Sequence, residues 1–217
     1  MLKREGKMQK FLKENWKFYF LNVLLAVGIY LSSKIYDITN QVTANVHILQ
    51  MPLDKLVPFI PQFIVIYNSL EPVIYISLIF FFIFHPKIFS AFALAMISLF
   101  LISNLVYVVF QTYVPRPILT PNTNLYIDRV ITLYNSDNPY NFFPSLHCGT
   151  SALVASFWFV KKRYRIIAWI MALWAFGIVL STQFLKQHVI VDIVGSFIAI
   201  GLYFVWYKLF NLGKESF

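Results

Sequence analysis

Residues 88–113 read IFSAFALAMISLFLISNLVYVVFQTY and contain no charged side chain. A helix needs about 20 consecutive apolar residues to cross the hydrocarbon core of a bilayer, so this segment predicts a membrane-spanning helix. Five further segments share its apolar character, and the fourth of the six is the shortest. The six predicted spans are Trp16–Ser33, Pro61–Phe84, Ile88–Tyr113, Ser145–Val160, Ile166–Thr182 and His188–Phe210.

The composition of the whole chain agrees with this assignment. Of its 217 residues, 59% are hydrophobic and 12% are charged, whereas roughly 25% of the residues in a soluble domain are charged. Too little polar surface remains to coat a water-soluble globule, and the low hydrophobicity typical of disordered chains is absent. Because the alternation typical of β-barrel strands is also missing, the sequence predicts an all-α integral membrane protein with a single domain, 1–217.

The distribution of basic residues predicts the orientation. Six crossings place both termini on one side, and thirteen of the eighteen Lys and Arg residues then fall on that side, in the tail 1–15, the cluster Lys161–Arg165 and short segments elsewhere. Basic residues concentrate on the cytoplasmic side of membrane proteins, so both termini are predicted to be cytoplasmic. The predicted location of the protein is the cell membrane. The basic residues form no face with interleaved aromatic residues, so no nucleic acid partner is expected.

Three polar clusters interrupt the apolar background, and all three map to the outer membrane boundary in this topology. They are Arg116 between two prolines, Pro144-Ser145-Leu146-His147, and Ser181-Thr182 followed by His188 and Asp192. Singly, each has an ordinary reading as an interfacial or helix-capping residue. His188 and Asp192 are harder to explain in that way, because residues four apart share a helix face and a carboxylate within a span is costly without a partner.

Together these residue types suit phosphoryl transfer, which needs a nucleophile, a proton donor and positive groups around the phosphate. His188 is the candidate nucleophile, oriented by Asp192, and His147 is the candidate acid for the leaving oxygen. Arg116 offers a two-pronged contact to phosphate, and Ser145 opens a helix whose free N–H groups favour anions. Two histidines and an aspartate also match a metal site.

The three motifs resemble those of the type 2 phosphatidic acid phosphatase superfamily, over roughly residues 109–192. The resemblance implies a membrane-embedded enzyme that works without metal or another cofactor. Three positions depart from the usual pattern: Val109 stands where the family has Lys, Thr182 where it has Arg, and Leu146 where it has Gly. The middle and last motifs look like the inositol phosphorylceramide synthase branch, although bacterial phosphatase-like proteins carry the same variants.

The resemblance predicts a lipid phosphatase that hydrolyses a phosphomonoester or diphosphate of a lipid at the outer leaflet, through a phosphohistidine. A lipid head-group phosphotransferase is the alternative, and a transporter or channel with a His/Asp/Glu relay is a further one. Arg129, or else Lys186, is expected to join Arg116 at the phosphate, and Thr182 to contribute a hydroxyl hydrogen bond. Glu71, in the second span, is equally consistent with a functional and a structural role. Lipid phosphate and membrane lipids are the expected partners, and the sequence predicts no oligomeric state.

Overall fold

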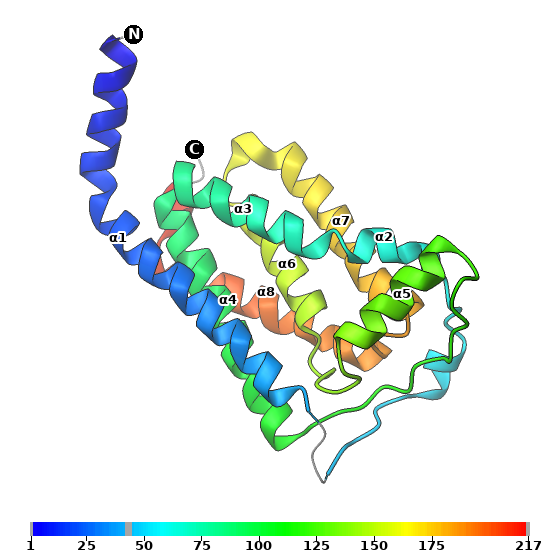
Figure 1. The fold of residues 1–217 in the computed structure, drawn as a ribbon. Helices are drawn as coiled ribbons and strands as arrows, with labels where there is room; N and C mark the ends of the chain where they lie inside the picture. The colour runs from blue at the N-terminus through cyan, green and yellow to red at the C-terminus, as the bar shows by residue number, and fades with distance from the viewer. Residues whose placement is uncertain (1, 42–44, 216–217) are drawn as a thin grey trace.

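The computed structural model describes residues 2–41 and 45–215, with side chains from Asn15 onward. In this part of the chain the protein is helical and contains no β-strand, as Figure 1 shows, so the predicted all-α class is confirmed. The α-helices are α1 (Leu2–Thr39), α2 (Ile64–Tyr67), α3 (Leu70–Phe84), α4 (Pro86–Val109), α5 (Leu125–Ser136), α6 (Leu146–Trp158), α7 (Arg165–Phe184) and α8 (Val194–Leu209). The side chains of the basic tail up to residue 14 lie outside the described residues.

Five of the six predicted spans coincide with segments that are long and apolar enough to cross a membrane, within the part of the chain that the structure describes. These are Asn15–Thr39, Pro61–Phe84, Pro86–Val109, Lys162–Phe184 and Ile190–Leu209. The protein is therefore a multi-pass membrane protein. The first span continues to Thr39, six residues beyond the predicted end at Ser33, because the helix does not break at the polar residues that follow.

The remaining predicted span forms α6, and six full crossings are not confirmed. A helix of 13 residues is only about 20 Å long at 1.5 Å per residue, less than the roughly 30 Å of a bilayer core. Instead of facing lipid along its length, α6 packs against α3, α4, α7 and α8. Leu153, Val154 and Phe157 are fully buried there. The short helix is thus the centre of the bundle.

Close approach of α6 and α8 fixes where the polar motifs meet. Gly195, at the start of α8, lies against the backbone of Ser145, so that a Cβ atom placed on the glycine would sit 2.2 Å from the Ser145 carbonyl oxygen. The backbone N–H of Ser145 in turn donates to the carbonyl of Asp192, at 3.0 Å. The second and third motifs are therefore in direct backbone contact.

The polar motifs and the basic segments lie at opposite ends of the bundle (Figure 1). At one end Glu215 forms ion pairs with Lys87 and Lys161, at 3.3 and 3.8 Å. At the other end the connection 110–145 folds over the openings of α6 and α8, and it contains α5, a helix that the sequence did not predict. Spans that cross the membrane in alternating directions would place the polar motifs and the basic segments on opposite sides. That the basic end faces the cytoplasm stays a prediction.

Candidate active site

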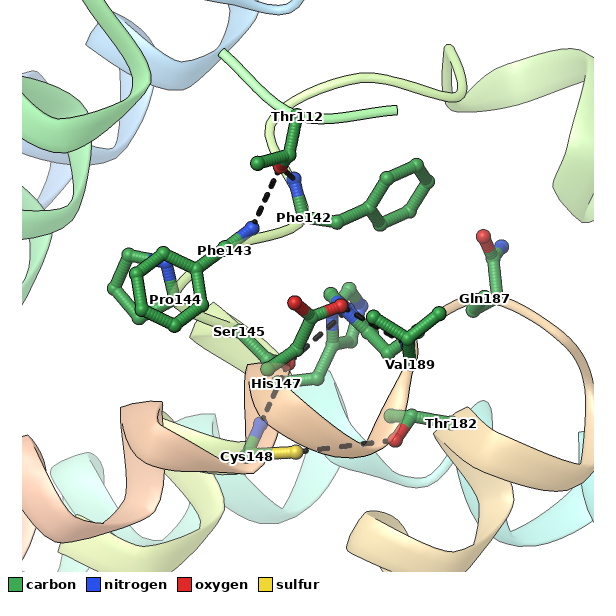
Figure 2. Close-up of polar contacts among 12 residues, drawn as sticks. Thr112, Phe142, Phe143, Pro144, Ser145, His147, Cys148, Thr182, Gln187 and Val189 are labelled. Atoms are coloured by element: carbon green, nitrogen blue, oxygen red, sulfur yellow. Dashed lines mark hydrogen bonds and ion pairs between the residues drawn. The ribbon is translucent and has the colours of Figure 1, made fainter. Parts of the chain in front are cut away.

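The segment before α6 is shaped by the hydroxyl of one threonine. Thr112 Oγ1 accepts the backbone N–H groups of Phe142 and Phe143, at 3.0 and 2.9 Å (Figure 2). The chain then enters α6 with Ser145 as its N-cap, where the Ser145 hydroxyl accepts the N–H of Cys148 at 3.2 Å. The predicted helix opening at Ser145 is confirmed, with a side-chain cap as its physical cause.

His188 and Asp192 meet as predicted, but not on the face of an α-helix. His188 precedes a 3₁₀ turn, Ile190–Ile193, and Asp192 is the third residue of that turn. The Asp192 carboxylate accepts the N–H of Val189 and faces His188 Nδ1, both at 3.0 Å. His188 is 5% exposed and Asp192 is fully buried. The carboxylate therefore both caps the turn and orients the imidazole.

Two of the predicted residues, Ser145 and His147, converge on one nitrogen atom of a third, His188. His188 Nε2 lies 3.0 Å from Ser145 Oγ and 3.3 Å from His147 Nδ1. Because a carboxylate only accepts hydrogen bonds, His188 carries its proton on Nδ1, facing Asp192, and its Nε2 presents a lone pair. This lone pair is what a nucleophilic histidine needs.

Arg116 is held firmly beside this group. Its Nη1 donates to the backbone carbonyls of Tyr134 and Asp137, at 3.1 and 2.6 Å, and its Nη2 donates to Gln187 Oε1 at 2.5 Å. The guanidinium also lies over the rings of Tyr134 and Phe142, 4.7 and 5.5 Å from their centroids. Its Nε is buried without a hydrogen-bond partner among the described residues. The Phe142 ring contacts His188 as well, so Arg116 and the histidine share one wall.

The other predicted phosphate-binding residues have different environments. Thr182 is fully buried and its hydroxyl donates to the Val179 carbonyl at 2.8 Å, while its own carbonyl accepts the N–H groups of Gln187 and His188. Lys186 donates to the carbonyls of Asp54 and Val57, and partial burial lowers the pKa of its ammonium group. Thr182 thus shapes the His188 loop through its backbone.

The two basic residues that were expected to join Arg116 lie in different places. Arg129 is exposed on α5, whereas Lys186 lines a small cavity together with His188, Asp54 and Val189. Whether either contacts a phosphate stays a prediction.

Sequence reasoning missed four residues of the site: Tyr67, Thr112, Asp137 and Gln187. Asp137 carries the largest consequence, since its carboxylate lies 3.5 Å from Arg116 Nη2 and accepts hydrogen bonds from Tyr36 and Asn40. Burial raises the pKa of Asp137, against the opposing effects of these partners. None of the four stands out in its own stretch of sequence, because the contacts depend on segments far apart in the chain.

A long cavity of about 830 Å³ leads away from the two histidines. It runs between α1 and α3, which both pack on α4, and its mostly apolar wall includes Ala26, Ile74 and Phe89. Tyr19 of α1 bonds to the Ile83 carbonyl of α3 at 2.8 Å, where these helices approach the basic end. Glu71, in the first turn of α3, also lines the cavity. We call this space the α1–α3 groove.

Among the described residues, the His, Cys, Asp and Glu side chains form no cluster of three or more that could hold a metal ion. The expectation of a metal-independent reaction stays a prediction.

Comparison with known proteins places these features in a family. No curated protein and no solved structure matches the chain. A family model described as the PAP2 superfamily matches residues 46–206, which include Arg116, Ser145, His147, His188 and Asp192. The match supports an enzyme of the phosphatase or phosphotransferase type. Because it covers most of the chain, and all three motifs, the protein belongs to the PAP2 superfamily.

Proposed function

We propose that this protein is a membrane-embedded lipid phosphatase, which hydrolyses a lipid phosphomonoester or diphosphate at the outer leaflet through a phosphohistidine. The observation that carries the proposal is the continuity of the α1–α3 groove with the histidine pair: His147 and His188 line the same cavity as Ala26 and Phe89. A long apolar cavity that ends on a nucleophile suits a substrate with a hydrocarbon chain and a reactive head group.

The first step forms a bond between His188 Nε2 and phosphorus, and breaks the bond from phosphorus to the lipid oxygen. His147, protonated, gives its Nδ1 proton to that oxygen, so the lipid leaves as an alcohol. Asp192 balances the positive charge that develops on His188. Arg116 and the N–H groups in the first turn of α6 face the negative phosphate oxygens.

The second step restores the enzyme. Water attacks phosphorus, the bond to His188 Nε2 breaks, and the neutral His147 takes the proton that the water loses. Inorganic phosphate leaves, and both histidines regain their starting protonation. The same two residues therefore serve both steps, with His147 as acid and then as base.

A head-group phosphotransferase is the second candidate, and the pairing of Arg116 with Asp137 favours it. A phosphodiester carries one negative charge and a phosphomonoester close to two. With the nearest guanidinium paired to a carboxylate at 3.5 Å, a singly charged donor needs less compensation. In this reaction an acceptor alcohol replaces water in the second step.

Purified protein in detergent, given labelled lipid phosphates and phosphodiesters with and without acceptor alcohols, tests both candidates. Free phosphate identifies a hydrolase, and a new phosphodiester identifies a transferase. Ala26→Trp should obstruct the groove and raise the KM for a long-chain substrate, without changing turnover of soluble p-nitrophenyl phosphate. Val27→Trp is the matched control, since Val27 is exposed on the same helix and does not line the groove. No turnover with any phosphate ester would refute the proposal.

The outer-leaflet position has its own test. Cys148 is buried, so a cysteine introduced at exposed Thr123 would be the thiol that reacts with an impermeant reagent. Labelling of intact cells supports an outward-facing loop. Labelling that requires lysis contradicts it.

A further inference from the structure

Tyr67 contacts the catalytic pair from an element outside the three motifs. It is the last residue of α2, and its ring is 6% exposed in a cluster with Ile64, Val130 and Leu185. Its hydroxyl oxygen lies 2.6 Å from His147 Nε2, and the two rings are tilted by 30° with centroids 4.8 Å apart. The tyrosine therefore holds the side of His147 that faces away from His188.

The hydrogen-bond network determines which atoms carry protons in the resting site. Asp192 keeps the His188 proton on Nδ1, and Ser145 Oγ, which already accepts the Cys148 N–H, donates to His188 Nε2. His147 Nδ1, 3.3 Å from the same lone pair, must then carry a proton to form a hydrogen bond. In a neutral imidazole the other nitrogen is an acceptor. His147 Nε2 thus accepts the hydroxyl proton of Tyr67.

Catalysis reverses this arrangement. To act as an acid, His147 must first be protonated on both nitrogens. After it has given the Nδ1 proton to the leaving oxygen, it is neutral, with its proton on Nε2 and a free lone pair on Nδ1. In both of these states Nε2–H needs an acceptor, because a buried N–H without a partner is costly. A tyrosine hydroxyl can donate in the first state and accept in the other two.

We propose that Tyr67 is a positioning residue, which holds the His147 ring by Nε2 and so keeps Nδ1 turned toward the reaction site through every protonation state of the cycle. The inference rests on the proposed function, since it assigns Tyr67 a part in the acid and base steps. A hydroxyl suits this position better than an amide or a carboxylate, because it changes between donor and acceptor by rotating its hydrogen.

Kinetics of Tyr67→Phe, which keeps the ring and removes the hydroxyl, test the proposal. Phosphoenzyme formation from an alkyl phosphate, measured by acid quenching, should slow roughly ten- to hundredfold, as expected when a buried N–H loses its partner. Phosphoenzyme formation from p-nitrophenyl phosphate, measured by its nitrophenol burst, should change by less than about threefold, because this leaving group needs little protonation. Hydrolysis of the phosphoenzyme, in which His147 is the base, should slow equally for both substrates. A structural defect alone would lower both rates of phosphoenzyme formation equally.

Tyr107→Phe is the matched control. Tyr107 is also buried, and its hydroxyl also makes a 2.6 Å hydrogen bond, but to the Pro144 carbonyl rather than to a histidine. Any loss of activity in this variant should be the same for alkyl and aryl phosphates. In the His147→Asn background, Tyr67→Phe should cause no further loss, because its effect passes through His147.

A second measurement does not depend on turnover. Histidine-selective ¹⁵N labelling in detergent gives ring signals from only four histidines. Tyr67→Phe should shift the His147 ring nitrogens and leave His47 and His85 unchanged, while Tyr107→Phe should leave the tautomer of His147 unchanged. An unshifted His147 signal, or phosphoenzyme formation slowed equally with alkyl and aryl phosphates, would overturn the role of Tyr67. If the wild type were inactive on every phosphate ester but the spectral shift were seen, the proposed function and the catalytic role would be refuted. Only the hydrogen bond between Tyr67 and His147 would then be supported.

Discussion

The Arg116 guanidinium lies 3.5 Å from the Asp137 carboxylate, and the two side chains are only 9% and 18% exposed. The arginine that is expected to bind phosphate is therefore already paired with a negative charge. Backbone carbonyls of Tyr134 and Asp137, together with Gln187, hold the same guanidinium in place. The carboxylate is thus not needed to fix the arginine, and its main effect is on the charge of the site.

Asp137→Asn should strengthen the binding of anionic substrate. The change removes one negative charge, keeps an acceptor for Tyr36 and Asn40, and leaves the backbone carbonyls that orient Arg116. We expect the KM and the inhibition constant of inorganic phosphate to fall about fivefold, for an interaction on the order of 1 kcal/mol. A higher KM would mean that the carboxylate, not the backbone, orients Arg116.

The same variant should change how stability depends on pH. Because burial raises the pKa of Asp137 in the fold, the folded protein binds more protons than the unfolded chain between the unfolded pKa, about 3.9, and the raised value. The wild-type free energy of unfolding therefore falls as pH rises through this window. Melting temperatures in detergent should show the wild type losing stability relative to Asp137→Asn from about pH 4 upward. The opposite trend would mean that the ion pair outweighs desolvation.

Gly195→Ala should damage both the fold and the site. A Cβ at this position would lie 2.2 Å from the Ser145 carbonyl oxygen, a backbone atom that cannot move without shifting the start of α6. Overpacking typically costs about 1–3 kcal/mol, and the displaced Ser145 would lose its contact with His188. We expect a lower melting temperature and at least about tenfold less activity.

Gly201→Ala, in the same helix, is the control for that substitution. No atom lies within 4 Å of a Cβ built at Gly201, so activity should stay at its wild-type value and the melting temperature should stay the same or rise, since alanine favours a helix more than glycine does. Equal effects of the two substitutions would contradict the importance of the contact between Gly195 and Ser145.

The histidines should differ in the kind of activity they lose. His188→Ala should prevent a phosphoenzyme altogether, and turnover should fall by about three or more orders of magnitude. His147→Ala should slow phosphoenzyme formation from an alkyl phosphate as severely and from p-nitrophenyl phosphate much less, because only the alkyl leaving group needs a proton. Rapid acid quenching with ³²P-labelled substrate measures the phosphoenzyme. Phosphoenzyme formation slowed equally with both substrates in His147→Ala would count against its role as the acid.

Sequence patterns predicted five of the six spans, and the contact between His188 and Asp192, because these depend on local features, namely apolar runs and short spacings. Residues 88–113 and the sequence from Ser181 to Asp192 carry such features. The burial of α6 depends instead on what surrounds it, since a short apolar segment reads alike in lipid and in a protein core. Asp137 and Tyr67 were missed because their partners, Arg116 and His147, are brought close only by the folded chain. Membership of the family indicates which motifs form the site. It does not indicate which residues outside the motifs contact them.

The site lacks the two cationic residues that the resembled motifs carry, since Val109 and Thr182 stand in their places. A phosphomonoester near the membrane boundary needs more than one cationic partner, because charge is weakly screened there. Val109 is 72% exposed at the end of α4, and the Thr182 hydroxyl is already donated to a carbonyl. Of the two replacements expected from the sequence, we now expect Lys186 rather than Arg129. Lys186 lines with His188 a cavity of about 10 Å³, room for one water molecule, and has a third N–H beyond the two that bond to Asp54 and Val57,.

Lys186→Ala should therefore raise the KM and weaken inhibition by inorganic phosphate, about tenfold for the loss of one charged contact, while Arg129→Ala should stay close to the wild type. Since Lys186 also anchors the loop at Asp54, Lys186→Met separates the two roles: it keeps much of the side-chain volume but removes the charge, and should be as impaired as the alanine variant. Lys186→Arg should restore phosphate inhibition if charge is what matters. Wild-type constants in both Lys186→Ala and Arg129→Ala would remove the replacement idea, and would leave the N–H groups that open α6 as the main partners of Arg116 around the phosphate.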